Sequence, residues 1–285
     1  MSPPRWLTSC VLLIFFLVFA SASGAVAQDS IARFHELALQ VTNARLDGER
    51  DDTAALESAL RLLDSVALAA LNAPPASNLD AGKLDAAKLD AAKLDLLNCA
   101  LAGYATPQPL GGESYRVLAL DSAGGAFALL ANFGLSGPGA VRLYARRPPV
   151  PPQTAPGGFA LAARIDHATF GDFFDESVEL APIGKGSDAP GDVVFVTVSG
   201  RTDDLQTGVF GAWRLHDGRV TSLWTTELLP HSTYAVENGA FRVAFCSDVD
   251  DDRPRDCRAM VRERYAWSDG AWKRIERAPV PVPGR

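Results

Sequence analysis

Cysteine and histidine are scarce in this sequence, and their scarcity argues against several classes of protein. Four cysteines in 285 residues are too few for a small scaffold stapled by disulfides. The four histidines do not cluster, and no His-x-x-x-His spacing would place two metal ligands on one helix face. No glycine-rich nucleotide-binding motif opens a helix, and Pro138 stands where the nucleophile elbow of a serine hydrolase needs glycine. The sequence therefore carries no motif for nucleotide or nucleophilic chemistry.

Positive charge is also in short supply. The chain has 27 Lys and Arg residues against 34 Asp and Glu residues, a net charge of −7. Nucleic acid and anionic lipid both select basic surfaces, so the balance argues against either as a partner. Hydrophobic residues make up 47% of the chain, which predicts a globular protein of one or two domains.

Residues 1–27 have the pattern of a secretory signal peptide. Arg5 is the only charge, an apolar core of about 15 residues follows over 6–20, and residues 21–27 are small. Ala25 and Ala27 form the small-x-small site that signal peptidase accepts, so the mature chain is expected to begin at Gln28. The core is shorter than the roughly 20 residues of a membrane-spanning helix, and no later segment is apolar enough to cross a membrane. Arginine outnumbers lysine 22 to 5, typical of GC-rich bacteria, so we expect a secreted or periplasmic bacterial protein.

Helices are expected in the segment 28–75, and a linker after it. Apolar residues recur at helical spacing over 31–41 and 56–71, and two prolines follow at 74 and 75. Residues 76–97 hold a five-residue repeat in which each of four leucines precedes an aspartate. Successive leucines would lie about 140° apart around a helix and share no face. This range is therefore predicted as a low-complexity linker.

The range 98–285 is predicted as an antiparallel β domain. Runs rich in Val, Leu, Phe, Tyr and Trp alternate with turn signals and give about twelve strands in one meander. Three dipeptides are typical of two-residue hairpin turns: Asp217-Gly218, Asn238-Gly239 and Asp269-Gly270. Residues 212–224 resemble one blade edge of a quinoprotein-type β-propeller repeat, without a clear second copy. The expected fold class is α+β, mainly β, with a sheet, sandwich or barrel favoured over a partial propeller.

An aspartate-rich segment at 248–256 is the most informative local motif. Asp248, Asp250, Asp252 and Asp256 occupy alternating or near-alternating positions, from which carboxylates in a tight loop can converge on calcium. The spacing resembles the calcium loops of FG-GAP and VCBS repeats in secreted bacterial proteins, which implies a structural calcium site. The family's glycines near the fourth and sixth loop positions are absent. A solvated acidic hairpin remains the alternative interpretation.

Two of the four cysteines are predicted to form a disulfide. Cys246 and Cys257 flank the acidic segment at expected strand ends, and in an oxidising compartment a disulfide across this hairpin neck is geometrically reasonable. Two free buried thiols are the alternative. Cys99 is then the odd cysteine, for which a buried thiol and an intermolecular bridge both stay open.

A second acidic cluster lies at 166–176 and includes Asp166, His167, Asp172, Asp175 and Glu176. Paired carboxylates beside a histidine can perform acid–base chemistry, although loops between strands are routinely acidic. Our leading hypothesis is an exported, non-enzymatic protein that binds a protein or extracellular polymer or supports the envelope. The alternatives are an extracellular hydrolase using Asp172, Asp175 and Glu176, and a calcium-dependent adhesion module using the 248–256 segment.

Overall fold

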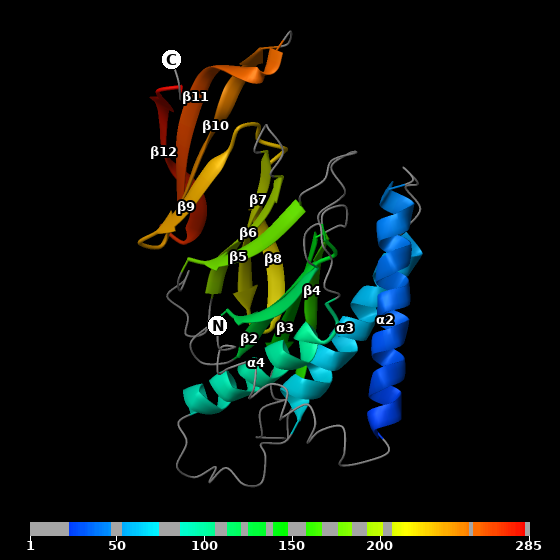
Figure 1. Ribbon diagram of the computed structural model, residues 1–285. Helices are drawn as coiled ribbons and strands as arrows, with labels where there is room; N and C mark the ends of the chain where they lie inside the picture. Colours follow the sequence, from blue (N-terminus) through cyan, green and yellow to red (C-terminus); the bar gives the residue numbers. More distant parts are fainter. Residues whose placement is uncertain are drawn as a thin grey trace, which may run out of the picture.

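The computed structural model describes residues 23–46, 53–73, 86–105, 113–120, 125–134, 139–147, 158–166, 176–183, 193–201, 207–250 and 253–282. These residues form three helices followed by twelve antiparallel strands (Figure 1). The predicted fold class, α+β and mainly β with the helices first, is confirmed.

The helices precede the strands in the chain. They are α2 (Ser23–Leu46), α3 (Thr53–Asn72) and α4 (Ala86–Ala102). Both predicted amphipathic stripes are present, and α3 ends two residues before the predicted stop at Pro74. Helix α4 begins inside the predicted linker, and Leu97 at the end of that range is buried. Leu94, the last leucine of the repeat, also packs on the helical core, so the prediction of a linker is wrong for this end of the range.

Twelve strands form three separate sheets instead of one. Sheet A contains β1 (Ser114–Ala119), β2 (Ala126–Asn132), β3 (Gly139–Arg146) and β4 (Phe159–Asp166). Sheet B contains β5 (Glu176–Pro182), β6 (Val193–Arg201), β7 (Gly208–His216) and β8 (Arg219–Thr225). Sheet C contains β9 (Thr233–Glu237), β10 (Ala240–Asp250), β11 (Arg253–Ser268) and β12 (Ala271–Val280). Each is a four-stranded meander with its strands in chain order, so none closes into a barrel.

The three predicted hairpin turns are confirmed by their backbone angles. Asp217, Asn238 and Asp269 have φ near +50°, and the glycine after each also has positive φ. Two successive residues with positive φ match the right-handed twist of the flanking strands, which is why Asp-Gly and Asn-Gly are favoured here. These turns join β7 to β8, β9 to β10 and β11 to β12.

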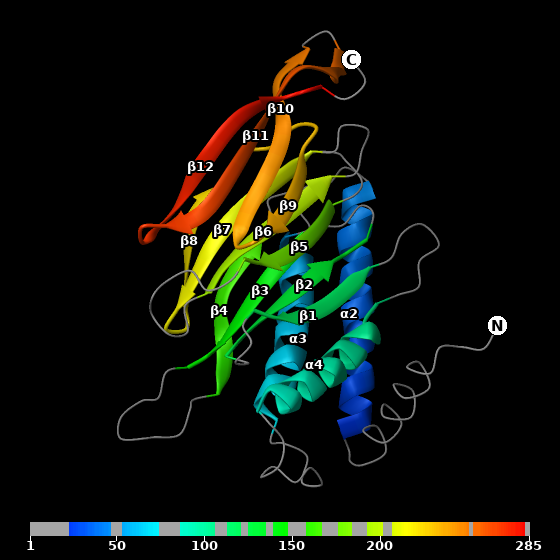
Figure 2. The ribbon, with the colours of Figure 1, turned by 90° about the vertical axis from the view of Figure 1, so that its left-hand side faces the viewer.

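The sheets and helices stack in chain order as four layers (Figure 2). The helices pack on one face of sheet A through a core that includes Phe34, Leu63 and Tyr144. The other face of sheet A packs on sheet B around Leu143 and Phe195. Sheet B packs on sheet C through six aromatic residues: Phe210, Trp224, Phe241, Tyr265, Trp267 and Trp272. Sheet C is therefore the terminal layer, and its second face is turned away from the stack.

Candidate functional site

The predicted calcium loop lies at the far end of the β10–β11 hairpin. Strand β10 extends to Asp250 and β11 begins at Arg253, so most of the 248–256 segment is paired strand. The side chains of Asp248 and Asp256 are exposed. Asp252 and the side chain of Asp250 lie outside the described residues. Within the described part of the chain, no three His, Cys, Asp or Glu side chains gather as metal ligands, and calcium binding stays a prediction.

The predicted disulfide between Cys246 and Cys257 is present. The Cα atoms are 5.7 Å apart, and the register of the hairpin shifts between Cys246 and Asp250. Those shifts bring the two cysteines together, although neither is the register partner of the other. Met260 packs with the disulfide in a small apolar cluster. Cys99, partly buried on α4, is a disulfide cysteine, so its interpretation as a buried thiol is wrong.

The second acidic cluster falls largely outside the described residues. Asp166 ends β4 and Glu176 begins β5. His167, Asp172 and Asp175 lie outside the described residues, as does the side chain of Glu176. The hydrolase interpretation therefore remains a prediction.

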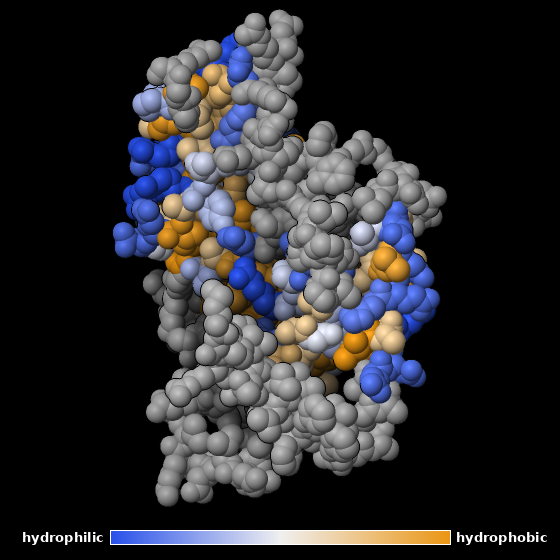
Figure 3. All heavy atoms as spheres, viewed as in Figure 1, coloured by the Kyte–Doolittle hydropathy of each residue, from blue (hydrophilic) through white to orange (hydrophobic). Residues whose placement is uncertain are grey.

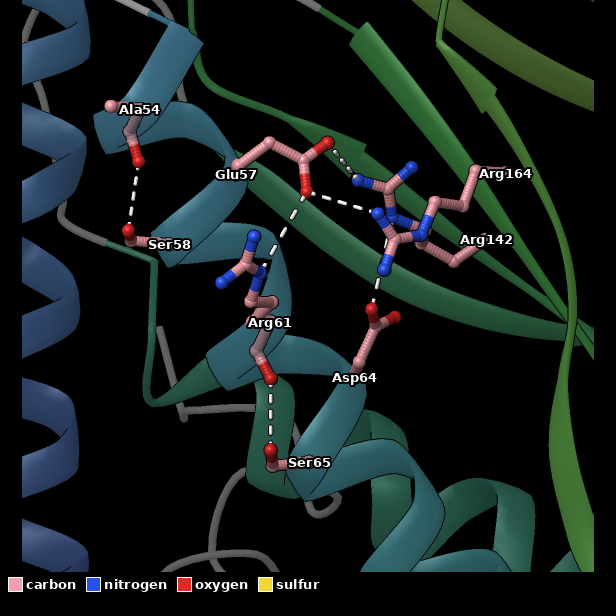
Figure 4. A network of polar contacts seen from close by, with 8 residues as sticks. All are labelled: Ala54, Glu57, Ser58, Arg61, Asp64, Ser65, Arg142 and Arg164. Atoms are coloured by element: carbon pink, nitrogen blue, oxygen red, sulfur yellow. Dashed lines mark hydrogen bonds and ion pairs between the residues drawn. The ribbon is translucent and has the colours of Figure 1, made fainter.

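The described residues assemble a polar cluster that the sequence reasoning missed. It joins Glu57 and Asp64 on α3 to Arg142 on β3 and Arg164 on β4 (Figure 4). Arg142 is fully buried. Its Nη2 lies 3.5 Å from Oε1 of Glu57, and its Nε lies 3.9 Å from Oδ2 of Asp64.

The two carboxylates use their other oxygens for different partners. Oε2 of Glu57 lies 3.2 Å from Nη1 of Arg164, which is the cross-strand partner of Arg142. Oδ1 of Asp64 accepts a 2.6 Å hydrogen bond from the hydroxyl of Tyr144. Burial raises the pKa of Asp64, whereas the hydrogen bond from Tyr144 and the charge of Arg142 act to lower it. The cluster thus forms an ionic contact between the helical layer and sheet A.

A sequence signal for this cluster existed. Glu57 and Asp64 are seven positions apart on α3, which returns them to one helix face within about 20°. That face also carries the buried leucines of the stripe. Arg142 interrupts an otherwise apolar strand. An acidic pair on an apolar stripe and an arginine inside an apolar strand predict mutual neutralisation, because unpaired buried charge is costly.

A second polar cluster lies on sheet C. Glu263 is buried, and its Oε1 accepts a 2.6 Å hydrogen bond from Nη1 of Arg274. Its Oε2 accepts a hydrogen bond of 2.5 Å from the hydroxyl of Tyr265. Burial and this hydrogen bond raise the pKa of Tyr265 to about 12. The Tyr265 ring also contacts Trp224 of sheet B at a centroid distance of 4.3 Å. Glu263 and Tyr265 are two residues apart on β11 and share a face, so the cluster lies beside the B–C core.

Neither polar cluster has the parts of a catalytic centre. Each carboxylate is held by arginine or tyrosine, and a general acid or base needs a reachable proton and space for a substrate. The first cluster joins the helical layer to sheet A, and the ion pairs of the second lie within sheet C. No protein-family model, curated protein or solved structure matches this chain. No helix among the described residues is long and apolar enough to span a membrane.

Proposed function

We propose that this protein is exported by a bacterium and acts in the envelope by binding a partner. The observation that carries the proposal is the Cys246–Cys257 disulfide, because disulfides persist in oxidising compartments and are rare in the cytosol. The signal-peptide pattern of residues 1–27 supports the same location.

The position of the expected cleavage site in the fold is compatible with this proposal. Helix α2 begins at Ser23, and Gln28 and Asp29 are exposed. Among the α2 side chains that the structure describes, which begin at Gln28, the first that packs on the core is Ile31. A chain that starts at Gln28 therefore keeps the α2 contacts from Ile31 onward.

Binding is favoured over catalysis by what the buried polar residues do. Glu57, Asp64 and Glu263 neutralise arginines between or within layers, so they serve stability. The layered stack instead presents a broad terminal face on sheet C, which is suited to contact with a partner.

Export and oxidation can be tested together. The chain is expressed with its first 27 residues in a Gram-negative host, and the fractions are labelled with a maleimide polymer before and after reduction. We expect periplasmic protein that starts at Gln28 and is labelled at Cys246 and Cys257 only after reduction. A chain that starts at Met1 in the cytosolic fraction, with both thiols free, would overturn the proposal. A Cys246→Ser, Cys257→Ser variant identifies which labelled thiols belong to the hairpin.

A further inference from the structure

The far part of the β10–β11 hairpin projects beyond both edge strands of sheet C. Strand β9 pairs with β10 only as far as Ala244, and β12 pairs with β11 only from Met260 onward. Residues 245–250 and 253–259 therefore form a two-stranded segment, which we call the ribbon (Figure 1). A two-stranded hairpin is marginally stable in water on its own, so the shape of the ribbon depends on what holds it locally.

A regular ribbon could not hold the Cys246–Cys257 disulfide. Cys246 lies opposite Met260, and Val249 lies opposite Cys257, so the two cysteines stand three register positions apart. Three positions along an extended strand span about 10 Å, and side chains three positions apart point to opposite faces. A disulfide needs Cα atoms within about 7 Å of each other and side chains that point toward each other. The regular register and this disulfide therefore exclude each other.

The observed ribbon leaves the regular register between the two cysteines. Its pairing shifts three times between Cys246 and Asp250, so that Asp248 lies opposite Ala259 and not opposite Arg258. The Cα atoms of the two cysteines are then 5.7 Å apart. Two views show the ribbon bending away from the direction of the main part of sheet C (Figure 1, Figure 2).

The bent ribbon surrounds the disulfide with apolar side chains. Cys246 and Cys257 are 3% and 9% exposed, and they form a cluster with Met260. Three valines pack on this cluster: Val249, Val280 and Val282. The main-chain N–H of Cys246 also donates a 2.9 Å hydrogen bond to the carbonyl of Pro230. Figure 3 shows hydrophobic side chains at this upper end of sheet C, above a hydrophilic outer side.

We infer that oxidation of Cys246 and Cys257 switches the ribbon from a regular shape to the bent one. While both cysteines are thiols, the regular register places Asp248 opposite Arg258, and opposite charges across strands are stabilising. Exchange with a disulfide oxidant forms the Sγ–Sγ bond: the two thiols lose two protons and two electrons, which reduce the oxidant's disulfide to two thiols. This inference rests on the proposed function, because export supplies the oxidising compartment.

The switch is confined to the ribbon. From Ala240 to Cys246 the pairing of β10 with β11 has no register shift. The side chains of Phe241 and Tyr265 in this part belong to the B–C core. The main part of sheet C is thus held by contacts that do not involve the disulfide, and the ribbon can open locally while the stack stays folded.

The experiment follows main-chain contacts across the ribbon by NMR in the purified chain that starts at Gln28. The protein is measured oxidised, after reduction with dithiothreitol, and after reoxidation with glutathione disulfide. Cys246→Ser with Cys257→Ser supplies a permanently open state without reductant. The matched control is Cys99→Ser, the same substitution at a cysteine on α4. Hydrogen exchange measured by mass spectrometry on the same samples reports how often the ribbon opens.

In the oxidised protein and in Cys99→Ser we expect contacts between Asp248 and Ala259. After reduction, and in the double variant, contacts between Asp248 and Arg258 should replace them. Amide exchange in the ribbon should then be faster by about tenfold or more. Contacts between Phe245 and Val261 should persist in every state, and reoxidation of the unaltered protein should restore the first pattern.

Three results would overturn the inference. The first is that contacts between Asp248 and Ala259 persist after reduction and in the double variant. The second is that the contacts between Phe245 and Val261 are lost with them, which would show that the disulfide holds the whole sheet. The third is a reduced ribbon without any cross-strand contact. Because the assay uses purified protein, its failure is separate from a failure of export.

Discussion

The side-chain amide of Asn98 on α4 pairs with the main chain of Val117 on β1 through two hydrogen bonds. Its Oδ1 accepts from the Val117 N–H at 2.6 Å, and its Nδ2 donates to the Val117 carbonyl at 3.0 Å. Asn72 on α3 makes the same pair of bonds with Phe159 on β4, at 2.7 and 3.1 Å. Since β1 and β4 are the two edge strands of sheet A, these helical asparagines supply hydrogen-bond partners to main-chain groups at both edges.

Replacing Asn98 tests this edge contact. We expect Asn98→Ala to lower the free energy of unfolding by about 2 kcal/mol, because both main-chain groups of Val117 lose their partner under a covering helix. Asn98→Asp keeps the acceptor but places a carboxylate against the Val117 carbonyl, so it should not restore stability. Urea unfolding measures the stability of both variants. As a control, Asn43→Ala at an exposed position should lower the free energy of unfolding by under about 0.5 kcal/mol. An Asn98→Asp variant as stable as the unaltered protein would contradict the two-bond arrangement.

The buried charge of Arg142 is expected to be costly to remove. Arg142→Met leaves Glu57 and Asp64 without their buried counter-charge, which should cost about 3–5 kcal/mol. Adding Glu57→Gln and Asp64→Asn to Arg142→Met removes both carboxylates that faced Arg142 and should recover most of that loss. The denaturant midpoint reports each variant, with Arg33→Met on the surface as control. No recovery in the triple variant would show that the lost packing of Arg142, and not its charge, sets the cost.

Alkaline titration should show that folding hinders the ionisation of the tyrosines. All five, at positions 104, 115, 144, 234 and 265, have a pKa raised by burial. The folded state thus retains phenol protons that the unfolded chain loses near pH 10. The resulting stability is complete below that pH and is lost as pH rises further. Absorbance at 295 nm should show little tyrosinate at pH 10.5 in the native protein and about half-ionised or more tyrosine in guanidinium.

Calcium should have a small effect if the acidic hairpin is a site. Extracellular modules bind calcium at about 10⁻⁴–10⁻³ M, so millimolar calcium would stabilise the protein by roughly 1 kcal/mol or less. We expect a small rise in melting temperature that is absent in Asp248→Asn with Asp252→Asn and smaller after reduction. Asp29→Asn with Asp95→Asn, which changes exposed charge elsewhere, should keep the rise. An unchanged melting temperature in the unaltered protein would favour the solvated hairpin.

Local patterns predicted the strands and turns because their causes are local. Asp217, Asn238 and Asp269 mark turns through the backbone angles that these residues and their glycines tolerate. The disulfide was predictable because both cysteines flank one hairpin. The division into three sheets was not, since it depends on which strand faces which across a core. The Glu57–Arg142 contact was missed for the same reason, because its partners are 85 positions apart in sequence.

Layer order and chain order coincide in this fold, and this coincidence would affect how the chain folds if it is exported as proposed. A chain that emerged from a translocation pore in N-to-C direction could assemble the helices and sheet A before sheet B had left the pore. At each stage the newest sheet would have one apolar face uncovered until the next sheet forms. Phe195 of sheet B then covers sheet A, and Phe241 of sheet C covers sheet B. Sheet C ends this dependence because its outer side carries Arg242, Arg262 and Arg264. A chain truncated after sheet B would leave the aromatic face of that sheet bare, and an exposed apolar face of this kind makes a product prone to aggregation.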